Sequence, residues 1–416
     1  MSSSGDPTDS RSSRATPAAG LALPGGIWAL GLGSMLMDIS SELIHSLLPV
    51  FMASVLGASM LVIGVVEGVA EATAAFTKVF SGALSDLLRR RKPLLILGYA
   101  LAALTKPVFP LASSIGWVFI ARFVDRVGKG IRGAPRDALV ADIAPPRLRG
   151  AAYGLRQALD SVGALTGPLL AVALLAWLDD DLRAVMWFAV PPAFLAVAVL
   201  CAYVREPAQG GAGAAERAAP AWAEVARLPL RYWLVVLLGA VFTLARFSEA
   251  FLVLRAQDVG LALGQVPLVM VAMNACYASI AYPAGVAGDR LGPRTLLLVG
   301  LALLIAADLV LAVAASPLLV FVGAALWGSH MAFTQGLLAK LVADTAPAER
   351  RGTAFGVFHL VSGAALLLAS VIAGALWSAF GPSAAFETGA AFAAAAVLVL
   401  LAYRTTPEAV ERGSAP

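Results

Sequence analysis

The chain has 416 residues, of which 60% are apolar and 13% are charged, whereas soluble domains are roughly 45 to 50% apolar and about 25% charged. This composition excludes a water-soluble protein. The net charge is only +4, and the basic residues form short clusters beside apolar runs, a pattern typical of orientation in a membrane rather than of nucleic-acid binding. We therefore expect a lipid bilayer, and no nucleic acid, around this chain.

A flexible cytoplasmic tail over residues 1–24 is predicted because this segment is rich in Ser, Thr, Pro and Ala and does not read as a signal peptide. Twelve apolar runs follow, and each is long enough to span a bilayer, which takes about 20 residues of helix. They are predicted at 25–54, 59–84, 93–112, 115–141, 149–176, 184–204, 231–256, 263–286, 293–314, 317–341, 353–378 and 383–403.

One connection, 205–230, is long and polar, and it divides six runs from six. We therefore predict an all-α membrane protein with twelve transmembrane helices. Its N-terminal six-helix bundle covers 25–204 and its C-terminal six-helix bundle covers 231–403. A cytoplasmic linker joins the bundles, and a cytoplasmic tail covers 404–416.

Lys and Arg in the short connections predict the orientation, because cytoplasmic loops retain them. With the N-terminus inside, only Arg183 and Arg255 fall on the outer side, whereas the inner side holds clusters such as 89–92 and 147–149. The sequence therefore predicts a multi-pass protein of the plasma membrane, the inner membrane of a bacterium, with both termini in the cytoplasm.

An internal repeat indicates that the two halves are related. Residues 141–154 reappear as 343–356, with Asp-x-Ala-Pro and Arg-Gly in both copies, and residues 82–86 reappear as 285–289. The two matches have nearly the same offset, close to half the chain length. They predict duplicated halves, an architecture in which substrate sites form near the membrane midplane between the repeats.

At these residues the chain resembles the major facilitator superfamily, over essentially all of Ile27 to Tyr403. The loop motif of that family, Gly-x-x-x-Asp-Arg-x-Gly-x-Arg, is matched by the second copy and in part by the first, where Leu87 replaces an Arg. The residues concerned are Gly82, Asp86, Arg90, Arg91, Gly285, Asp289, Arg290 and Arg294. The resemblance implies a gating loop in which the Asp meets the positive end of a helix and the arginines pair across the halves.

A second resemblance concerns the run at 149–176, where Gly163, Gly167 and Pro168 are similar to the Gly-x-x-x-Gly-Pro element of proton-linked antiporters, although Leu and Ala follow the proline in place of glycines. The run at 115–141 resembles an Arg-bearing motif of the family from Arg122 to Gly128. Together these features look like a drug-exporter-like bacterial branch, in which one chain holds both halves and acts as a monomer.

Ionisable residues inside the predicted spans are the candidate functional residues, since a central charge in hydrocarbon costs at least ~2.5 to 3.5 kcal/mol unless it has a partner or a water-filled cavity. The candidates for proton coupling or substrate contact are Asp38, Glu42, Glu67, Glu71, Arg122, Asp125, Arg126, Lys129, Gln157, Asp160, Arg246, Glu249 and His359. In the first half acidic and basic groups nearly balance, so we expect most of them to pair with one another.

The positions of these residues predict particular ion pairs and a small set of possible proton carriers. Asp125 is expected to pair within its own helix with Arg122 or Lys129, and Arg246 is expected to pair with Glu249, three residues away. The hypothesis for coupling is that one buried carboxylate takes up and releases a proton as an arginine approaches it. The candidate carriers are Asp38, Glu42, Glu71 and Asp160.

The leading functional interpretation is a secondary transporter that exports a small organic solute in exchange for protons, with the first half coupling the proton and the second supplying an apolar substrate surface. Uptake or exchange of an organic anion, a siderophore or a metal chelate is the alternative, motivated by the buried cations. A receptor without transport is disfavoured because an idle pore has no reason to keep costly charges. No spacing indicates an enzyme, a cofactor or a metal site.

Overall fold

The computed structural model describes residues 23–88, 90–145, 148–206, 228–334, 337–346 and 351–402. The predicted tails and most of the predicted linker lie outside these ranges, as do some side chains of helical residues beside the gaps. Every regular element in the described part of the chain is a helix, so the predicted all-α fold is confirmed.

The first half contains the six predicted spans as eight helices and one π-helical turn. They are α1 (Gly25–Val50), η1 (Phe51–Val55), α2 (Met60–Leu88), α3 (Arg91–Thr105), α4 (Val108–Leu111), α5 (Ile115–Ile143), α6 (Arg149–Trp177), α7 (Leu182–Trp187) and α8 (Val190–Tyr203). Prolines account for two of the breaks, because Pro107 separates α3 from α4 and α8 begins with Pro at its first positions.

The second half repeats the pattern. It contains α10 (Leu230–Leu244), α11 (Ala250–Asp258), the short 3-10 helix η3 (Leu263–Gln265), α12 (Leu268–Leu291), α13 (Pro293–Ala312), α14 (Pro317–Thr334), α15 (Leu337–Thr345), α16 (Arg351–Phe380) and α17 (Pro382–Ala402). The predicted run at 231–256 is therefore two helices, α10 and α11, separated by five residues.

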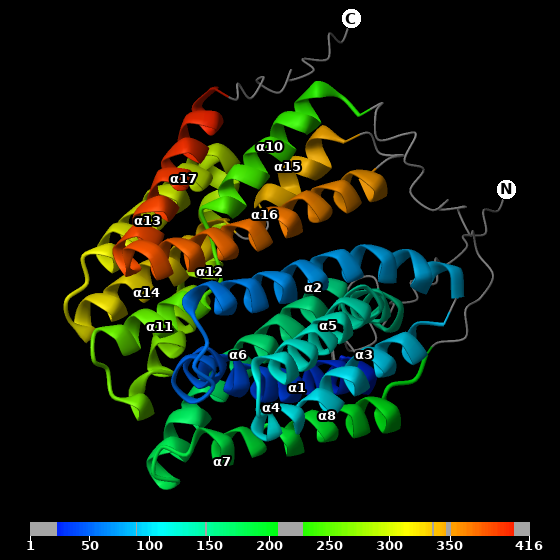
Figure 1. Cartoon of the computed structure of the whole chain (residues 1–416). Helices are drawn as coiled ribbons and strands as arrows, with labels where there is room; N and C mark the ends of the chain where they lie inside the picture. Colours follow the sequence, from blue (N-terminus) through cyan, green and yellow to red (C-terminus); the bar gives the residue numbers. More distant parts are fainter. Residues whose placement is uncertain are drawn as a thin grey trace, which may run out of the picture.

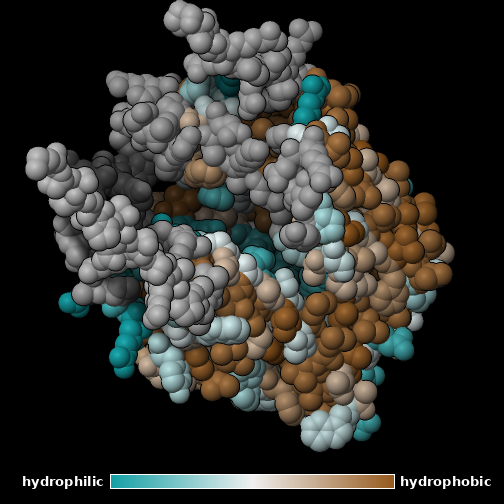
Figure 2. Space-filling view, turned by 180° about the vertical axis from the view of Figure 1, so that it is seen from behind, coloured by the Kyte–Doolittle hydropathy of each residue, from teal (hydrophilic) through white to brown (hydrophobic). Residues whose placement is uncertain are grey.

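Ten helical segments in the described residues are long and apolar enough to cross a membrane, and α10 is a shorter apolar helix. The predicted span at 115–141 is not among the ten, although α5 is 29 residues long, since its charged side chains lower its hydropathy. Those charges face inward: Arg122, Asp125 and Arg126 are buried. The coloured part of the face shown in Figure 2 is mostly hydrophobic, as a surface in contact with lipid requires.

Figure 1 shows the two six-helix bundles, with α2 of the first half lying along α16 of the second. The two bundles share one hydrophobic cluster, which takes Leu43 to Met52 from the end of α1 and extends into the second half. A separate cluster around Ile27, Tyr99 and Leu200 belongs to the first half alone. The halves are therefore joined most firmly at the end of the bundle where α1 ends.

The α2–α16 contact depends on glycines that let two antiparallel backbones approach closely. A Cβ atom on Gly64 would overlap the Ser370 carbonyl, and one on Gly374 would overlap the Met60 carbonyl. The two helices stay in contact at their other ends, where Gly356 lies against Val79.

Replacing Gly64 with Ala is therefore expected to lower the melting temperature of the purified protein in detergent, because the added methyl group meets a backbone carbonyl that cannot move aside. Gly154→Ala is the matched control, since this helical glycine has open space around its Cβ position and Ala stabilises a helix by up to about 1 kcal/mol relative to Gly. An equal rise in melting temperature for both variants would contradict the packing at Gly64.

Candidate functional site

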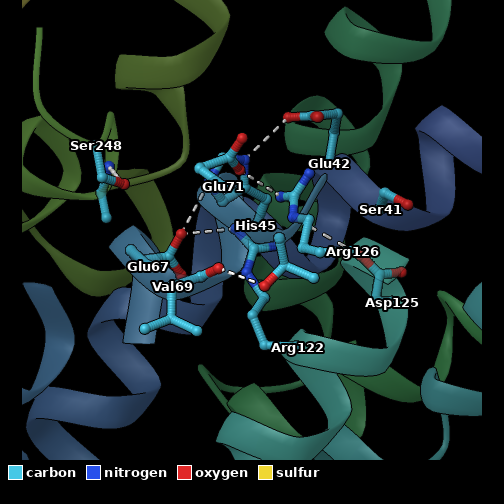
Figure 3. Close-up of polar contacts among 12 residues, drawn as sticks. Ser41, Glu42, His45, Glu67, Val69, Glu71, Arg122, Asp125, Arg126 and Ser248 are labelled. Atoms are coloured by element: carbon cyan, nitrogen blue, oxygen red, sulfur yellow. Dashed lines mark hydrogen bonds and ion pairs between the residues drawn. The ribbon is translucent and has the colours of Figure 1, made fainter. Parts of the chain in front are cut away.

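A hollow with hydrophilic residues on its floor opens between the two halves (Figure 2). Most of the predicted site residues lie on three helices of the first half, α1, α2 and α5. Figure 3 shows their side chains gathered together, with Ser248 of the second half across from them. This is the candidate functional site.

A buried ion pair between Glu67 of α2 and Arg122 of α5 forms the centre of the cluster. The Arg122 Nη2 donates to Glu67 Oε2 over 2.7 Å, and the two side chains are 3% and 0% exposed. His45 of α1 lies beside this pair, with its Nε2 3.8 Å from Glu67 Oε2 and its Nδ1 3.5 Å from Glu42 Oε2 (Figure 3). One polar chain thus connects the three helices.

Two further pairs surround this centre. The Arg126 guanidinium lies 3.1 Å from Glu71 Oε1, and the Lys106 ammonium donates to Asp125 Oδ1 over 2.9 Å and to Ser41 Oγ over 3.0 Å. Lys106 directly follows α3, which ends at Thr105. The predicted partners of Asp125, Arg122 and Lys129, are therefore wrong: Arg122 turns to Glu67, and Lys106 reaches the carboxylate from outside the helix. Within α5, Asp125 has Arg126 Nε 4.0 Å from its Oδ2.

A second charged cluster lies where α5 meets α6. Asp160 accepts from Arg156 Nη1 over 2.8 Å and lies 3.8 Å from Arg136 Nη1. Arg136 also donates to Ser34 Oγ over 2.6 Å, and both arginines lie within 3.8 Å of Asp137 Oδ1. Asp160, a predicted proton carrier, therefore has two cationic neighbours.

Asp38 differs from the other predicted carriers. It is half-buried, and within the described residues it makes no hydrogen bond and no ion pair. Its electrostatic neighbours include Lys129 and Asp160. Lys129 is exposed, also without a hydrogen bond or ion pair in the described part of the chain, and it interacts electrostatically with Glu42 and Glu71 as well. Asp38 and Lys129 are thus an acidic and a cationic side chain of the first half that have no ion-pair partner among the described residues.

The glycines of the antiporter-like element place α6 directly against the acidic face of α1. A Cβ atom on Gly163 would meet the Met35 carbonyl and the Asp38 Cβ, and one on Gly167 would meet the Ile39 carbonyl and the Glu42 Cβ. A larger residue at either position would separate α6 from the segment of α1 that carries the carboxylates. This gives the element a physical role in positioning the site.

Pro168 supplies a contact between the halves. Proline has no N–H, so within α6 it leaves the carbonyl four residues earlier, that of Ala164, without its helical donor. Asn274 on α12 of the second half donates its side-chain amide to this carbonyl over 3.1 Å. The proline therefore creates an acceptor that the opposite half uses.

In the second half the predicted pair of Arg246 and Glu249 is not formed, although both residues are described. They lie in the break between α10 and α11, where no helix places residues three apart on one face. Both are partly buried, and Glu249 interacts electrostatically with His45, Glu42 and Glu71 of the first half. Glu249 therefore faces the site from across the hollow.

The remaining polar candidates are Gln157 and His359. Gln157 is exposed, and its Oε1 accepts from Arg156 Nη2 over 3.4 Å. His359 is partly buried between the rings of Phe355 and Phe358 on α16. Neither touches the central cluster around Glu67.

The gating-loop prediction falls partly outside the described residues: the side chains of Gly82, Asp86, Gly285, Asp289 and Arg290 are not described. Of the rest, Arg91 forms an ion pair with Asp142 at the end of α5, and Arg294 Nη2 donates to the Leu401 carbonyl over 3.0 Å. Arg90 precedes α3 and is exposed.

The list of candidates from the sequence omitted several polar groups that the structure makes prominent. Lys106 and His45 belong to the central cluster, and Arg136 belongs to the second one; all three are single charges or histidines inside apolar runs, and so had the same signal as the residues chosen. Asp308 on α13, with 0% exposure, was missed altogether. Within the described residues no group of three His, Cys, Asp or Glu is arranged to hold a metal ion.

Comparisons with known proteins agree on one family. The sequence model described as the Major Facilitator Superfamily matches residues 30–256 and 247–416. An uncharacterized MFS-type transporter of Methanocaldococcus jannaschii is 32% identical over 381 residues, 90% of this chain and 94% of that protein. The multidrug resistance protein MdtH of Cronobacter sakazakii is 26% identical over 152 residues, 36% of this chain and 38% of that protein.

Among solved structures, a bacterial homolog of the human lysosomal transporter Spinster, in an inward-facing and unoccupied conformation, has a TM-score of 0.68 at 18% identity. The match covers 91% of this chain and 94% of that one. At this identity the likeness concerns the fold.

Proposed function

The chain belongs to the Major Facilitator Superfamily, and from this premise we propose that it exports a small organic solute across the plasma membrane in exchange for protons. Members of this family are carriers rather than enzymes, so the charged cluster serves binding and conformational change. The partial similarity to a multidrug resistance protein supports export, and the Gly163 to Pro168 element supports antiport.

The observation that carries the proposal is the carboxylate of Asp38, which is half-buried and has no ion pair or hydrogen bond in the described part of the chain. The other candidate carriers have cationic partners: Glu42 has His45, Glu71 has Arg126 and Asp160 has Arg156. A carboxylate paired with a cation takes up a proton less readily, because the cation stabilises the negative charge. Asp38 is therefore the group that takes up the coupling proton.

The proposed cycle follows from the charges around Asp38. When the hollow opens to the cytoplasm, Asp38 releases its proton, and Lys129 stabilises the carboxylate while the solute binds. When the hollow opens outside, the solute leaves and Asp38 takes up a proton from that side. The ion pairs between α1, α2 and α5 keep the first half rigid while it moves as one body.

The orientation and organisation are part of the same proposal. We place both termini and the linker at 205–230 in the cytoplasm, with tails over 1–24 and 404–416, because the basic connections gather there. The halves share their core at the end where α1 ends, so this arrangement is closed outside and open to the cytoplasm. Both halves lie in one chain, which acts as a monomer.

Exchange of an organic anion is the second candidate, and Lys129 is the observation that favours it. An exposed ammonium group without an ion pair in the described part of the chain is suited to bind a carboxylate or phosphate of a solute. Under this function the solute replaces the missing partner of Lys129.

Purified protein in liposomes with an internal pH indicator tests the proposal. A panel of amphipathic cations and organic anions is added in turn under an imposed pH gradient. Proton movement that depends on an amphipathic compound is expected, and movement of anions without protons would favour the second candidate. If no compound moves and no proton follows, transport itself is contradicted.

A further inference from the structure

Asp308 on α13 is a buried carboxyl group that the proposed cycle does not use. Its side chain is 0% exposed, and neither carboxyl oxygen has a hydrogen-bond partner. It packs against α17 at Gly389, where a Cβ atom would lie 2.7 Å from Asp308 Oδ2 and 3.0 Å from the ring of Phe247. The glycine leaves just enough space for the carboxyl group.

The internal repeat shows what stands at the same place in the first half. The offset that relates Asp142 to Asp344 also relates Lys106 to Asp308 and Asp125 to Trp327. Lys106 and Asp125, the two residues of the first half in these matches, form a buried ion pair with each other. A salt bridge in one half thus corresponds to an acid and an indole in the other.

The packing supports this correspondence. In the first half Gly98 of α3 lies against the Gly128 carbonyl of α5, and at the matching positions Gly300 of α13 lies against the His330 carbonyl of α14. The two pairs of helices therefore cross in the same way. Trp327 is one turn from His330 on α14, so it occupies the place of Asp125.

In the described part of the chain no cation forms an ion pair with Asp308. Trp327 is fully buried, its Nε1 has no partner among the described residues, and its ring packs 5.5 Å from that of Phe247, centroid to centroid. The buried cation Arg255 on α11 donates instead to the carbonyls of Leu311, Ala312 and Ala314 after Asp308 and forms an ion pair with Asp258. The other ionisable groups on the packed elements are His330 on α14, Glu387 on α17, and Arg246 and Glu249 beside Phe247; α12 adds Tyr277, Asp289 and Arg290. No described side chain among them forms an ion pair or a hydrogen bond with Asp308.

His330 is itself unusual, because its Nδ1 lies 2.9 Å from the Gly300 carbonyl whereas its buried Nε2 has no partner. If Nδ1 carries the hydrogen that this contact requires, Nε2 is a free acceptor. A donor (Trp327), an acceptor (His330) and an acid (Asp308) thus lie unused in the same part of the second half, where burying an unsatisfied polar group is costly.

We propose that Asp308 is a second proton-binding site of this transporter. It lies in the second half, for which the sequence predicted an apolar substrate surface and no proton coupling. An ionised carboxylate with no cation and no donor in an apolar core costs several kcal/mol, so the carboxyl group carries a proton in this arrangement. When the second half rearranges, water reaches the carboxyl group and accepts its proton, and the Trp327 N–H becomes the donor to the carboxylate. This inference rests on the proposed proton coupling.

Infrared spectroscopy of the full-length protein in lipid tests proton binding independently of transport. The wild-type spectrum is expected to contain the carbonyl band of a protonated carboxylic acid in apolar surroundings, and Asp308→Asn is expected to remove it. Glu387→Gln is the control, because Glu387 lies on α17 but is exposed. If Asp308→Asn does not fold, the aspartate carboxyl groups of the wild-type protein are labelled with carbon-13 instead, and this labelling is expected to shift the band. A band unchanged by either measure overturns the proposal.

The transport arm uses the same variants in liposomes. Asp308→Asn is expected to move one proton fewer per solute than the wild type while solute counterflow, which needs no net proton movement, continues. An unchanged number of protons per solute overturns the role of Asp308 in coupling. If the wild type moves no protons at all, the proposed function fails, and the infrared measurement still decides whether Asp308 binds a proton.

Discussion

Replacing Arg122 with Met is expected to destabilise the protein by about 3 to 5 kcal/mol, the cost of leaving one partner of a buried ion pair uncompensated. Glu67 would then be a carboxylate with 0% exposure, with only the more distant His45 beside it. The expected result is a strongly lowered melting temperature in detergent and little protein in the membrane fraction.

A double variant, Arg122→Met with Glu67→Gln, separates the cost of the orphaned charge from the loss of packing. Replacing both partners of a buried pair by neutral groups is often close to neutral, so the double variant is expected to recover most of the melting temperature. It is not expected to recover transport, because the central Glu67–Arg122 link between α2 and α5 is gone and only the Glu71–Arg126 pair still joins these helices. A double variant as unstable as the single one would show that Glu67 is not the reason for the loss.

Replacing Asp38 with Asn is expected to remove one coupled proton per solute without unfolding the protein. The side chain has no ion pair to lose in the described part of the chain, and Asn has the same shape as a protonated Asp. One coupled proton under a gradient of one pH unit is worth about 1.4 kcal/mol, which supports about a tenfold concentration ratio of the solute. The variant is expected to lose this accumulation in liposomes and to keep solute counterflow.

Glu71→Gln is the matched comparison, because Glu71 lies in the same half but is paired with Arg126. It is expected to change the affinity for the solute more than the number of protons moved. If Asp38→Asn accumulates the solute as the wild type does, Asp38 is not the coupling site, and the proton must be carried by another carboxyl group.

The helices of this fold were predictable from the sequence because the bilayer sets one dominant requirement, about 20 apolar residues in each span. The repeat made the two-bundle arrangement predictable as well. The break between α10 and α11 was not predicted, since residues 245–249 contain no proline or glycine and their polar side chains were interpreted as a charged pair within one helix.

The candidate site was predictable as a set of residues and not as a set of pairs. Buried charges are visible in an apolar sequence, but spacing along one helix does not show which residue a neighbouring helix presents. Asp125 therefore has its closest ion pair with Lys106, which follows α3, instead of with Arg122 or Lys129 on its own helix. Asp308 escaped notice because a lone acid in an apolar run has no charged neighbour to call attention to it.

Because Asn274 donates a hydrogen bond to the Ala164 carbonyl, the free energy of separating the two halves depends on whether water reaches that carbonyl. Separating α6 from α12 leaves that carbonyl without a donor, and Pro168 prevents the helix from supplying one. Water must therefore enter the interface in the same step as the halves part, because an unsatisfied carbonyl within the bilayer costs several kcal/mol. The proline thus makes the wetting of the α6–α12 interface a condition of its opening, and a dry intermediate is disfavoured.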